Sequence, residues 1–237
     1  MKVPCPFFLL CVSLGAQPHA VPPEEKPSPK SETLRYNINW PSGLSLGEGQ
    51  LTSTRLPPGE GGGWRFTLHL EASVPGFPVE EDVRSKATAD FCSVELEKEH
   101  LRGKRKTKEQ TRFDQQKLTA TRKTLEAGGT SEASLSPCAK DALAFLFFLR
   151  RELVQGRLSP RQKVYYGAAY DTRVEFTGTQ TVRLAESAVE ADRLVATFKG
   201  PASEAAIELF FARDAVRTPV MIRVPLAMGK FTMELSN

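Results

Sequence analysis

The sequence predicts a mainly β protein, in which a curled antiparallel sheet forms a half-barrel or barrel-like wall and one buried helix covers or plugs it. Two observations predict this fold class. Along many short segments, apolar and polar residues alternate with a period of two, as in strands with one buried and one solvated face. One continuous apolar segment, residues 142–149, departs from this pattern and is too short to cross a membrane.

The composition limits the functions that the chain can have. Its 237 residues include 32 basic and 28 acidic side chains, and so small a basic excess gives little support for nucleic acid as a partner. It has only 3 histidines, which leaves little material for metal ligands or for acid–base catalysis. We therefore expect no cofactor, no metal and no enzymatic activity.

The first residues have the pattern of a secretory signal. Lys2 precedes an apolar run at residues 7–16, about half the length that a membrane-spanning helix needs. We predict a signal peptide over residues 1–20, cleaved after Ala16 or Ala20, and a periplasmic or secreted protein. Prolines and charged residues then predict an extended linker over residues 21–32. A single β-rich domain is expected over residues 33–237.

About ten strands are expected in this domain, joined by short turns. Turns are predicted at the glycine-rich residues 57–63 and at residues 102–104, 114–117 and 228–230. So many strands predict strong curling of the sheet. The apolar faces of the clearest strands are Leu34/Tyr36/Ile38/Trp40, Trp64/Phe66/Leu68/Leu70, Tyr170/Thr172/Val174/Phe176, Leu194/Ala196/Phe198, Val220/Ile222/Val224/Leu226 and Phe231/Met233/Leu235.

The helix is expected to start at Ser136, an N-cap residue, with Pro137 in its first turn and Asp141 near its positive end. Residues 142–149 are apolar on all sides, which predicts burial against the concave face of the sheet. Arg150, Arg151 and Gly156 are expected to end it.

Cys92 and Cys138 are the pair of cysteines that remains once the signal is removed. Their spacing fits neither a redox motif nor a zinc site, so a structural disulfide is expected in an oxidising compartment. It would join the start of the helix to a strand.

One motif raises the alternative of a hydrolase. Residues 43–47, Gly-Leu-Ser-Leu-Gly, match the pattern that presents a nucleophilic serine, here Ser45. That motif requires a helix directly after the serine, whereas residues 48–54 alternate like a strand. The histidines that could assist are His69 and His100. A bend relieved by two glycines is the favoured interpretation.

Two charged segments have both a functional and a plain interpretation. Six basic residues gather near a predicted turn: Lys98, Arg102, Lys104, Arg105, Lys106 and Lys108. They could bind an anion or a phospholipid head group. Alternatively, they keep the end of a hairpin solvated and discourage aggregation through its edge. No aromatic residue lies between Phe91 and Phe113 to stack bases, which disfavours nucleic acid. The carboxylates of residues 80–82 are expected in a solvated loop, with ordinary properties.

Several short stretches together carry a family resemblance: Leu34–Trp40 with Gly43 and Gly47, residues 83–86, 91–93, 103–106 and 113–114, Pro137-Cys138 with residues 141–143 and 149–150, and residues 219–232. They resemble an exported bacterial family, the domain of unknown function 3108. It implies an envelope protein of curled antiparallel sheet, similar to the half-barrels that carry lipoproteins across the periplasm. It implies no catalytic residues.

The function expected is therefore that of a non-enzymatic periplasmic protein that binds a lipid or other apolar ligand, or an envelope protein, without spanning the membrane. The apolar faces of a curled sheet can line a ligand cavity or simply fill a core. The alternatives are the Ser45 hydrolase and a purely structural or interaction module that uses a sheet edge or the basic turn.

Overall fold

The computed structural model describes residues 31–74, 77–126, 128–185, 187–226 and 229–236. The predicted signal peptide (1–20), its cleavage site and nearly all of the linker (21–32) lie outside these residues. The described chain forms one sheet of 15 strands, one α-helix and one short 3-10 helix. The prediction of a mainly β, curled and antiparallel fold with one helix is confirmed.

The strands and helices follow one another along the chain with short connections. Their bounds are β1 Glu32–Asn39, β2 Ser45–Leu56, η1 Pro58–Glu60, β3 Gly63–Val74, β4 Phe77–Ala87, β5 Ser93–Arg102, β6 Arg105–Asp114, β7 Thr119–Thr124, β8 Thr130–Ser134, β9 Lys140–Asp141, α1 Ala142–Val154, β10 Gln162–Tyr165, β11 Ala169–Arg183, β12 Ala188–Lys199, β13 Glu204–Ala212, β14 Pro219–Leu226 and β15 Gly229–Ser236.

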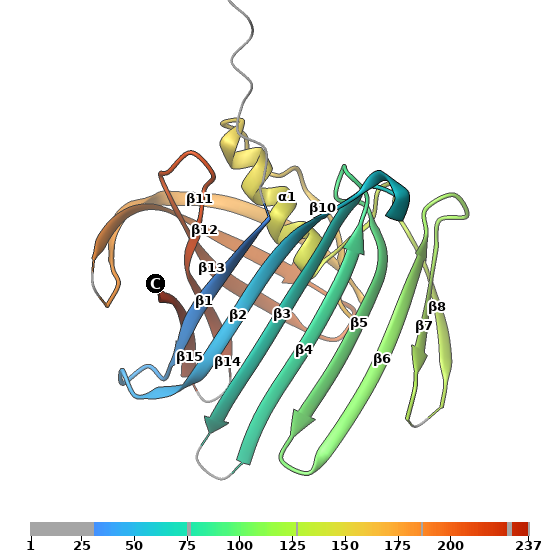
Figure 1. The fold of residues 1–237 in the computed structure, drawn as a ribbon, viewed down its shortest axis with the longest axis horizontal. Helices are drawn as coiled ribbons and strands as arrows, with labels where there is room; N and C mark the ends of the chain where they lie inside the picture. Colours follow the sequence, from blue (N-terminus) through green and yellow to red (C-terminus); the bar gives the residue numbers. More distant parts are fainter. Residues whose placement is uncertain (1–30, 75–76, 127, 186, 227–228, 237) are drawn as a thin grey trace, which may run out of the picture.

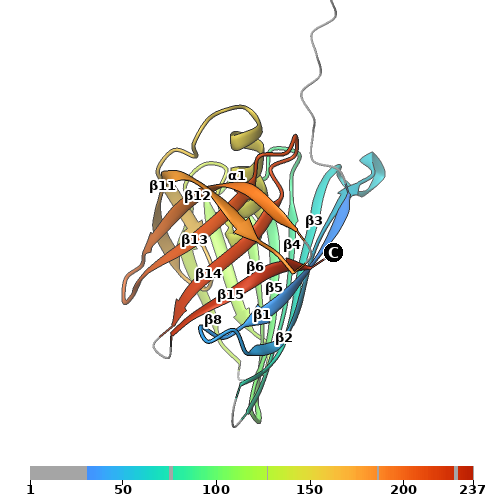
Figure 2. The same ribbon diagram turned by 90° about the vertical axis from the view of Figure 1, so that its left-hand side faces the viewer.

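The sheet consists of two meanders joined in its middle. Its strand order is β8-β7-β6-β5-β4-β3-β2-β1-β15-β14-β13-β12-β11-β10-β9, and every neighbouring pair is antiparallel except β9 and β10. The seam is the ladder between β1 and β15, which pairs Tyr36 with Leu235 and Ile38 with Met233. In Figure 1, β1–β6 form the front wall and β11–β14 the back wall. Figure 2 shows β13–β15 continuing into β1 and β2.

The period-two alternation sets which face is concave. Tyr36, Leu51 and Phe66 are almost fully buried and point to the inside of the curl, as their alternation predicts. The predicted turns at residues 57–63, 102–104 and 114–117 are confirmed, whereas the turn at 228–230 falls partly outside the described residues. The predicted number of strands was too small. All five side chains of β8 are exposed, so its sequence lacks the alternation by which strands were counted.

The start predicted for the helix was wrong. Its N-cap is Asp141, whose carboxylate accepts hydrogen bonds from the backbone N–H groups of Leu143 and Ala144. Ser136 and Pro137 precede the helix instead. The chain is not helical there, because Cys138 has a positive φ of 52° and residues 140–141 form β9, which pairs with β10. The predicted end is close to the observed one, with Gly156 directly after the C-cap Gln155.

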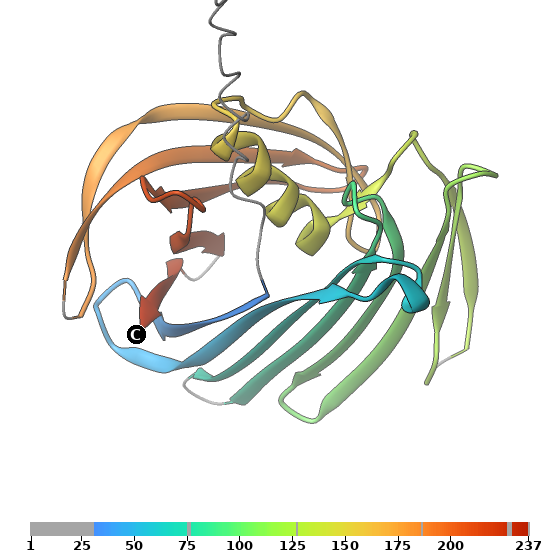
Figure 3. The same ribbon diagram turned by 45° about the horizontal axis from the view of Figure 1, so that its top comes forward.

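The helix fills one end of the space between the two walls (Figures 1 and 3). The ring of Phe147 stacks on that of Phe66 with centroids 4.2 Å apart, and Phe145 meets Phe198 of the opposite wall edge-on. Arg150 pairs with Glu32 and donates to the backbone oxygen of Arg217. The helix therefore contacts both meanders, as a covering or plugging element would.

Asp141 also ties the helix to the front wall. Its carboxylate is completely buried and accepts the hydroxyls of Ser85 on β4 at 2.6 Å and of Ser93 on β5 at 2.5 Å. Burial raises the pKa of Asp141, while these serines and the helix N–H groups act in the opposite direction. This position fixes the helix relative to two strands.

The two edges of the sheet approach each other without a shared ladder. The hydroxyl of Tyr165 on β10 donates to the backbone oxygen of Ser134 on β8 at 3.0 Å, and its ring meets Phe113 edge-on. Arg122 of β7 donates to the backbone oxygen of Gly167 at 2.7 Å. Side chains therefore join the edges of a sheet that remains unclosed by strand pairing.

Candidate functional site

Ionisable side chains gather on the concave face at β4–β7, where alternation would normally place apolar residues. We call this group the ionic cluster. It consists of Glu81, Lys98, His100, Glu109, Arg122 and Tyr166. The first five come from four adjacent strands, and Tyr166 follows β10. Buried charged groups need partners, because an unpaired charge in the interior is costly.

Glu81 is the centre of one half of the ionic cluster. It accepts a hydrogen bond from the hydroxyl of Tyr166, and its carboxylate lies 3.6 Å from Nδ1 of His100. Burial acts to raise the pKa of Glu81, but His100, Tyr166 and the charge of Arg102 outweigh it and lower the pKa. Burial and the neighbouring carboxylate together raise the pKa of Tyr166. Glu81 is therefore held as a carboxylate and Tyr166 as a hydrogen-bond donor.

Lys98 and Glu109 form the other half. The side chain of Lys98 is only 7% exposed, and its Nζ lies 2.9 Å from the carboxylate of Glu109 and 4.3 Å from the ring centroid of Tyr166. Arg122 approaches the same carboxylate at 3.7 Å. Burial opposes ionisation of Glu109, but Lys98 and Arg122 outweigh it and lower its pKa. These contacts satisfy the charges, so we assign this half a structural role.

The basic residues near the β5–β6 turn are divided between the two faces of the sheet. On the convex face, Lys106 and Lys108 both pair with Glu99. Arg102 and Arg105 lie directly opposite each other on the concave face. Within the described residues, neither arginine has a carboxylate within ion-pair distance. Together with His100 and Thr107 they line a hollow of about 280 Å³.

Beside these arginines, a line of apolar residues crosses the concave face. We call it the apolar row. Successive strand pairs place its members side by side: Val79, Ala72, Gly47, Ile38, Met233 and Ile222. Ile38 is buried, whereas the other five keep partial exposure to solvent. Gly47 has no room for a side chain, because an added Cβ would lie 1.9 Å from the backbone oxygen of Glu71. The row begins at Val79, which pairs with Arg102.

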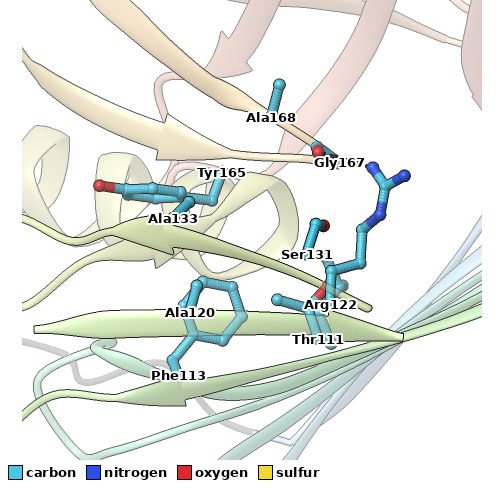
Figure 4. Close-up of a pocket in the computed structure, with 10 residues that line it drawn as sticks. Thr111, Phe113, Ala120, Arg122, Ser131, Ala133, Tyr165, Gly167 and Ala168 are labelled. Carbon is cyan, nitrogen blue, oxygen red and sulfur yellow. Dashed lines mark hydrogen bonds between the residues drawn. The ribbon is translucent and has the colours of Figure 1, made fainter. Parts of the chain in front are cut away.

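A small pocket lies where the two edges of the sheet meet (Figure 4). Phe113 and Ala120 form its floor, Tyr165 covers one side, and Arg122 and Gly167 close the other. Its volume is about 40 Å³, enough for a few water molecules at most and far below the roughly 300–1,000 Å³ of ligand pockets. This pocket is not the lipid-sized cavity that a closed ligand site would need.

The structure does not bring together the residues of the hydrolase alternative. Ser45 begins β2 and is followed by strand, so the strand–turn–helix context of a nucleophile is missing. His69 pairs with Gln50, five positions further along β2, which corresponds to roughly 16 Å. Its ring contacts Asp82 and Glu71 instead. His100 lies three strands away from β2.

Cys92 and Cys138 are joined in a disulfide, with Cα atoms 4.6 Å apart, as the sequence predicts. The bond connects the segment before β5 with the segment before the helix. In the described part of the chain, no group of histidine, cysteine and acidic residues could hold a metal ion. The described helix is not long and apolar enough to cross a membrane.

The ionic cluster was not predicted from the sequence, because residues 80–82 were expected in a solvated loop, and that expectation is wrong. They lie inside β4, and Glu81 points into the concave face. One signal in the sequence could have revealed this: Val79, Glu81 and Val83 are spaced two residues apart, so in a strand they share one face. The partners of Glu81 are 19 and 85 positions away, and no local pattern reports such distances.

Comparisons with known proteins agree with this architecture. A solved structure with a TM-score of 0.63 is described as a beta-barrel-like protein of domain of unknown function DUF1849 from Brucella abortus; it is 7% identical, and the match covers 88% of this chain and 96% of that one. At that identity the likeness concerns the fold alone. No curated protein matches the sequence. Residues 35–236 match the family described as protein of unknown function DUF3108. The chain therefore belongs to the DUF3108 family.

Proposed function

We propose that this protein is an exported, periplasmic binding protein without enzymatic activity, which holds an apolar ligand on the concave face of its sheet. The observation that carries the proposal is the apolar row, which lies on the concave face and yet, apart from the buried Ile38, remains partly accessible to solvent. A face used only as core would bury them at the packing density of protein interiors. Accessible apolar surface on a concave wall is what small-molecule sites offer.

Further apolar side chains continue this surface on both sides of the seam. Leu70 of β3 lies beside the apolar row, and Phe231 of β15 packs edge-on against Trp40 at 4.9 Å. Leu70, Trp40 and Phe231 are partly exposed. A ligand would lie along this open part of the concave face, away from the end that the helix fills.

Two features support export. The pattern of residues 1–20 is that of a cleavable signal. The disulfide between Cys92 and Cys138 is a bond that persists in oxidising compartments and is rare in the cytosol. Both features agree with a periplasmic location of the mature protein.

Native mass spectrometry of the full chain purified from cells tests the proposal directly, because a bound lipid adds a discrete mass that is lost on denaturation. M233Q places an amide in the apolar row and should lower the bound fraction. T232Q changes the adjacent residue, which points to the convex face, and should leave it unchanged. Absence of any added mass in all three proteins, together with no uptake of added fatty acid, would overturn the proposal.

A second candidate, binding of an envelope protein, is favoured by one observation. Strand β8 lies at an edge of the sheet, its five residues are all exposed, and no described strand covers its outer side. Such edges can accept a strand from a partner. Successive backbone N–H groups of an edge strand point alternately toward the neighbouring strand and away from it. One of the two substitutions S131P and E132P therefore removes an N–H group on the open side of β8, which a partner strand would need. If neither variant weakens capture of a partner from envelope extracts, this edge is not the interface.

A further inference from the structure

We propose that Arg102 and Arg105 form a binding site for the anionic head group of an amphiphile whose hydrocarbon chain lies on the apolar row. The inference rests on the proposed function and deepens it, because it states the chemical class of the ligand. The site is the hollow of about 280 Å³ that His100, Arg102, Arg105 and Thr107 line at the β5–β6 turn.

The charge distribution on this hairpin sets the two arginines apart. Like charges directly opposite each other on neighbouring strands destabilise a sheet, and Arg102 faces Arg105 across the ladder. The other ladder charges of the hairpin have acidic partners: Lys98 pairs with Glu109, and Lys106 pairs with Glu99. Among the described residues, neither arginine forms such a close ion pair, and the charge of Arg102 acts on Glu81 only from beyond ion-pair distance. An anion in the hollow would supply the missing negative charge.

The donors around the hollow fit a phosphate or carboxylate group. A guanidinium group donates two parallel hydrogen bonds to such an anion, and two guanidinium groups together can hold one head group from two sides. Thr107, which carries a hydroxyl donor, and His100 face each other across the ladder and line the same hollow. Nδ1 of His100 is buried and lies 3.6 Å from the carboxylate of Glu81, so this ring atom belongs to the ionic cluster and contributes nothing to the hollow.

The size and position of the hollow favour a head group over a complete small ligand. Its volume lies just below the range of about 300–1,000 Å³ that is typical of sites for whole ligands. It lies next to the apolar row, because Arg102 is the direct ladder neighbour of Val79, where the row begins. From Arg102 to Ile222 the row crosses six strand spacings, roughly 29 Å along the sheet. A long hydrocarbon chain can lie along such a path.

Isothermal titration calorimetry on the full chain tests the inference with three probes below their micelle concentrations. Dodecyl phosphate carries both parts of the ligand, dodecyl maltoside has the same chain with an uncharged head, and inorganic phosphate has no chain. The test variant is R102Q/R105Q. The matched control is K106Q/K108Q, which removes the same charge from the opposite face of the same hairpin.

We expect dodecyl phosphate to bind the wild-type protein most tightly. R102Q/R105Q should weaken it about 10- to 100-fold, as expected from the loss of charge-assisted hydrogen bonds. K106Q/K108Q should change binding less than about threefold, because both lysines lie on the convex face, away from the hollow, and act on the head group only through screened long-range charge. Binding of dodecyl maltoside should respond to neither pair of substitutions.

The possible failures are distinguishable. Equal binding of the two detergents, unaffected by R102Q/R105Q, would overturn the head-group site and leave the proposed function standing. Binding of inorganic phosphate as tight as that of dodecyl phosphate would also overturn it, because the site would then serve a free anion. If neither detergent binds the wild-type protein, the proposed function fails, and the inference fails with it.

Discussion

Asp141 provides the sharpest test of how the helix is held against the sheet. Its carboxylate accepts four hydrogen bonds, from two serine hydroxyls and from two N–H groups of the first helical turn. In D141A the helix loses its N-cap, which costs about 1 kcal/mol. The hydroxyls of Ser85 and Ser93 lose their buried acceptor, at about 1–3 kcal/mol each. We therefore expect D141A to lower the free energy of unfolding by about 4 kcal/mol.

Urea unfolding followed by circular dichroism, without reductant, measures this quantity, and a thermal scan should show a midpoint lower by roughly 8–16 °C. D141N keeps one oxygen for the helix N–H groups and should lose about half as much. D114A is the matched control, because Asp114 caps two backbone N–H groups at an exposed turn; about 1 kcal/mol or less is expected there. A loss for D141A no larger than for D114A would refute the reasoning.

Three further predictions concern the disulfide and the two halves of the ionic cluster. C92S/C138S should lower the free energy of unfolding by about 4 kcal/mol, the chain-entropy estimate for a bond between residues 46 positions apart, measured by urea unfolding. The pKa of Glu81 is lowered in the folded state, so its contribution to stability is present above its unfolded pKa and is lost as the pH falls through the folded pKa. E81Q should therefore lose less stability than the wild type between about pH 6 and pH 3; an identical pH profile would contradict this. E109L leaves Lys98 buried without its closest partner and should cost about 3 kcal/mol, whereas K98M/E109L removes both charges and should cost less; equal losses in a chemical denaturation experiment would argue against the pair.

Much of the architecture could be predicted because it depends on patterns of residues that are close together in the sequence. The alternation of Trp64, Phe66 and Leu68 fixes which face of β3 is buried. The disulfide followed from counting cysteines, and the existence of the helix from a single apolar run. The start of the helix was not accessible in the same way. Ser136 and Asp141 are both good N-caps, and only the pairing of β9 with β10 decides between them.

The candidate site was harder to predict because it depends on which residues share a face. The six basic residues near the β5–β6 turn form one group in the sequence, but the sheet separates Arg105 from Lys106. The apolar row draws on strands at both ends of the chain, from Ile38 to Met233, and exists only once β1 pairs with β15. No window along the sequence contains such a row.

The seam between β1 and β15 has a consequence for the order in which the protein can be completed during synthesis. β1 is among the first described segments to leave the ribosome, but the partner that covers its outer edge, residues 232–236, is among the last. Until then the nascent chain presents a bare strand edge next to Tyr36, a situation that invites pairing with other chains. We expect truncation before residue 229 to yield aggregates rather than a smaller soluble sheet, because β1 would then keep an unpaired edge.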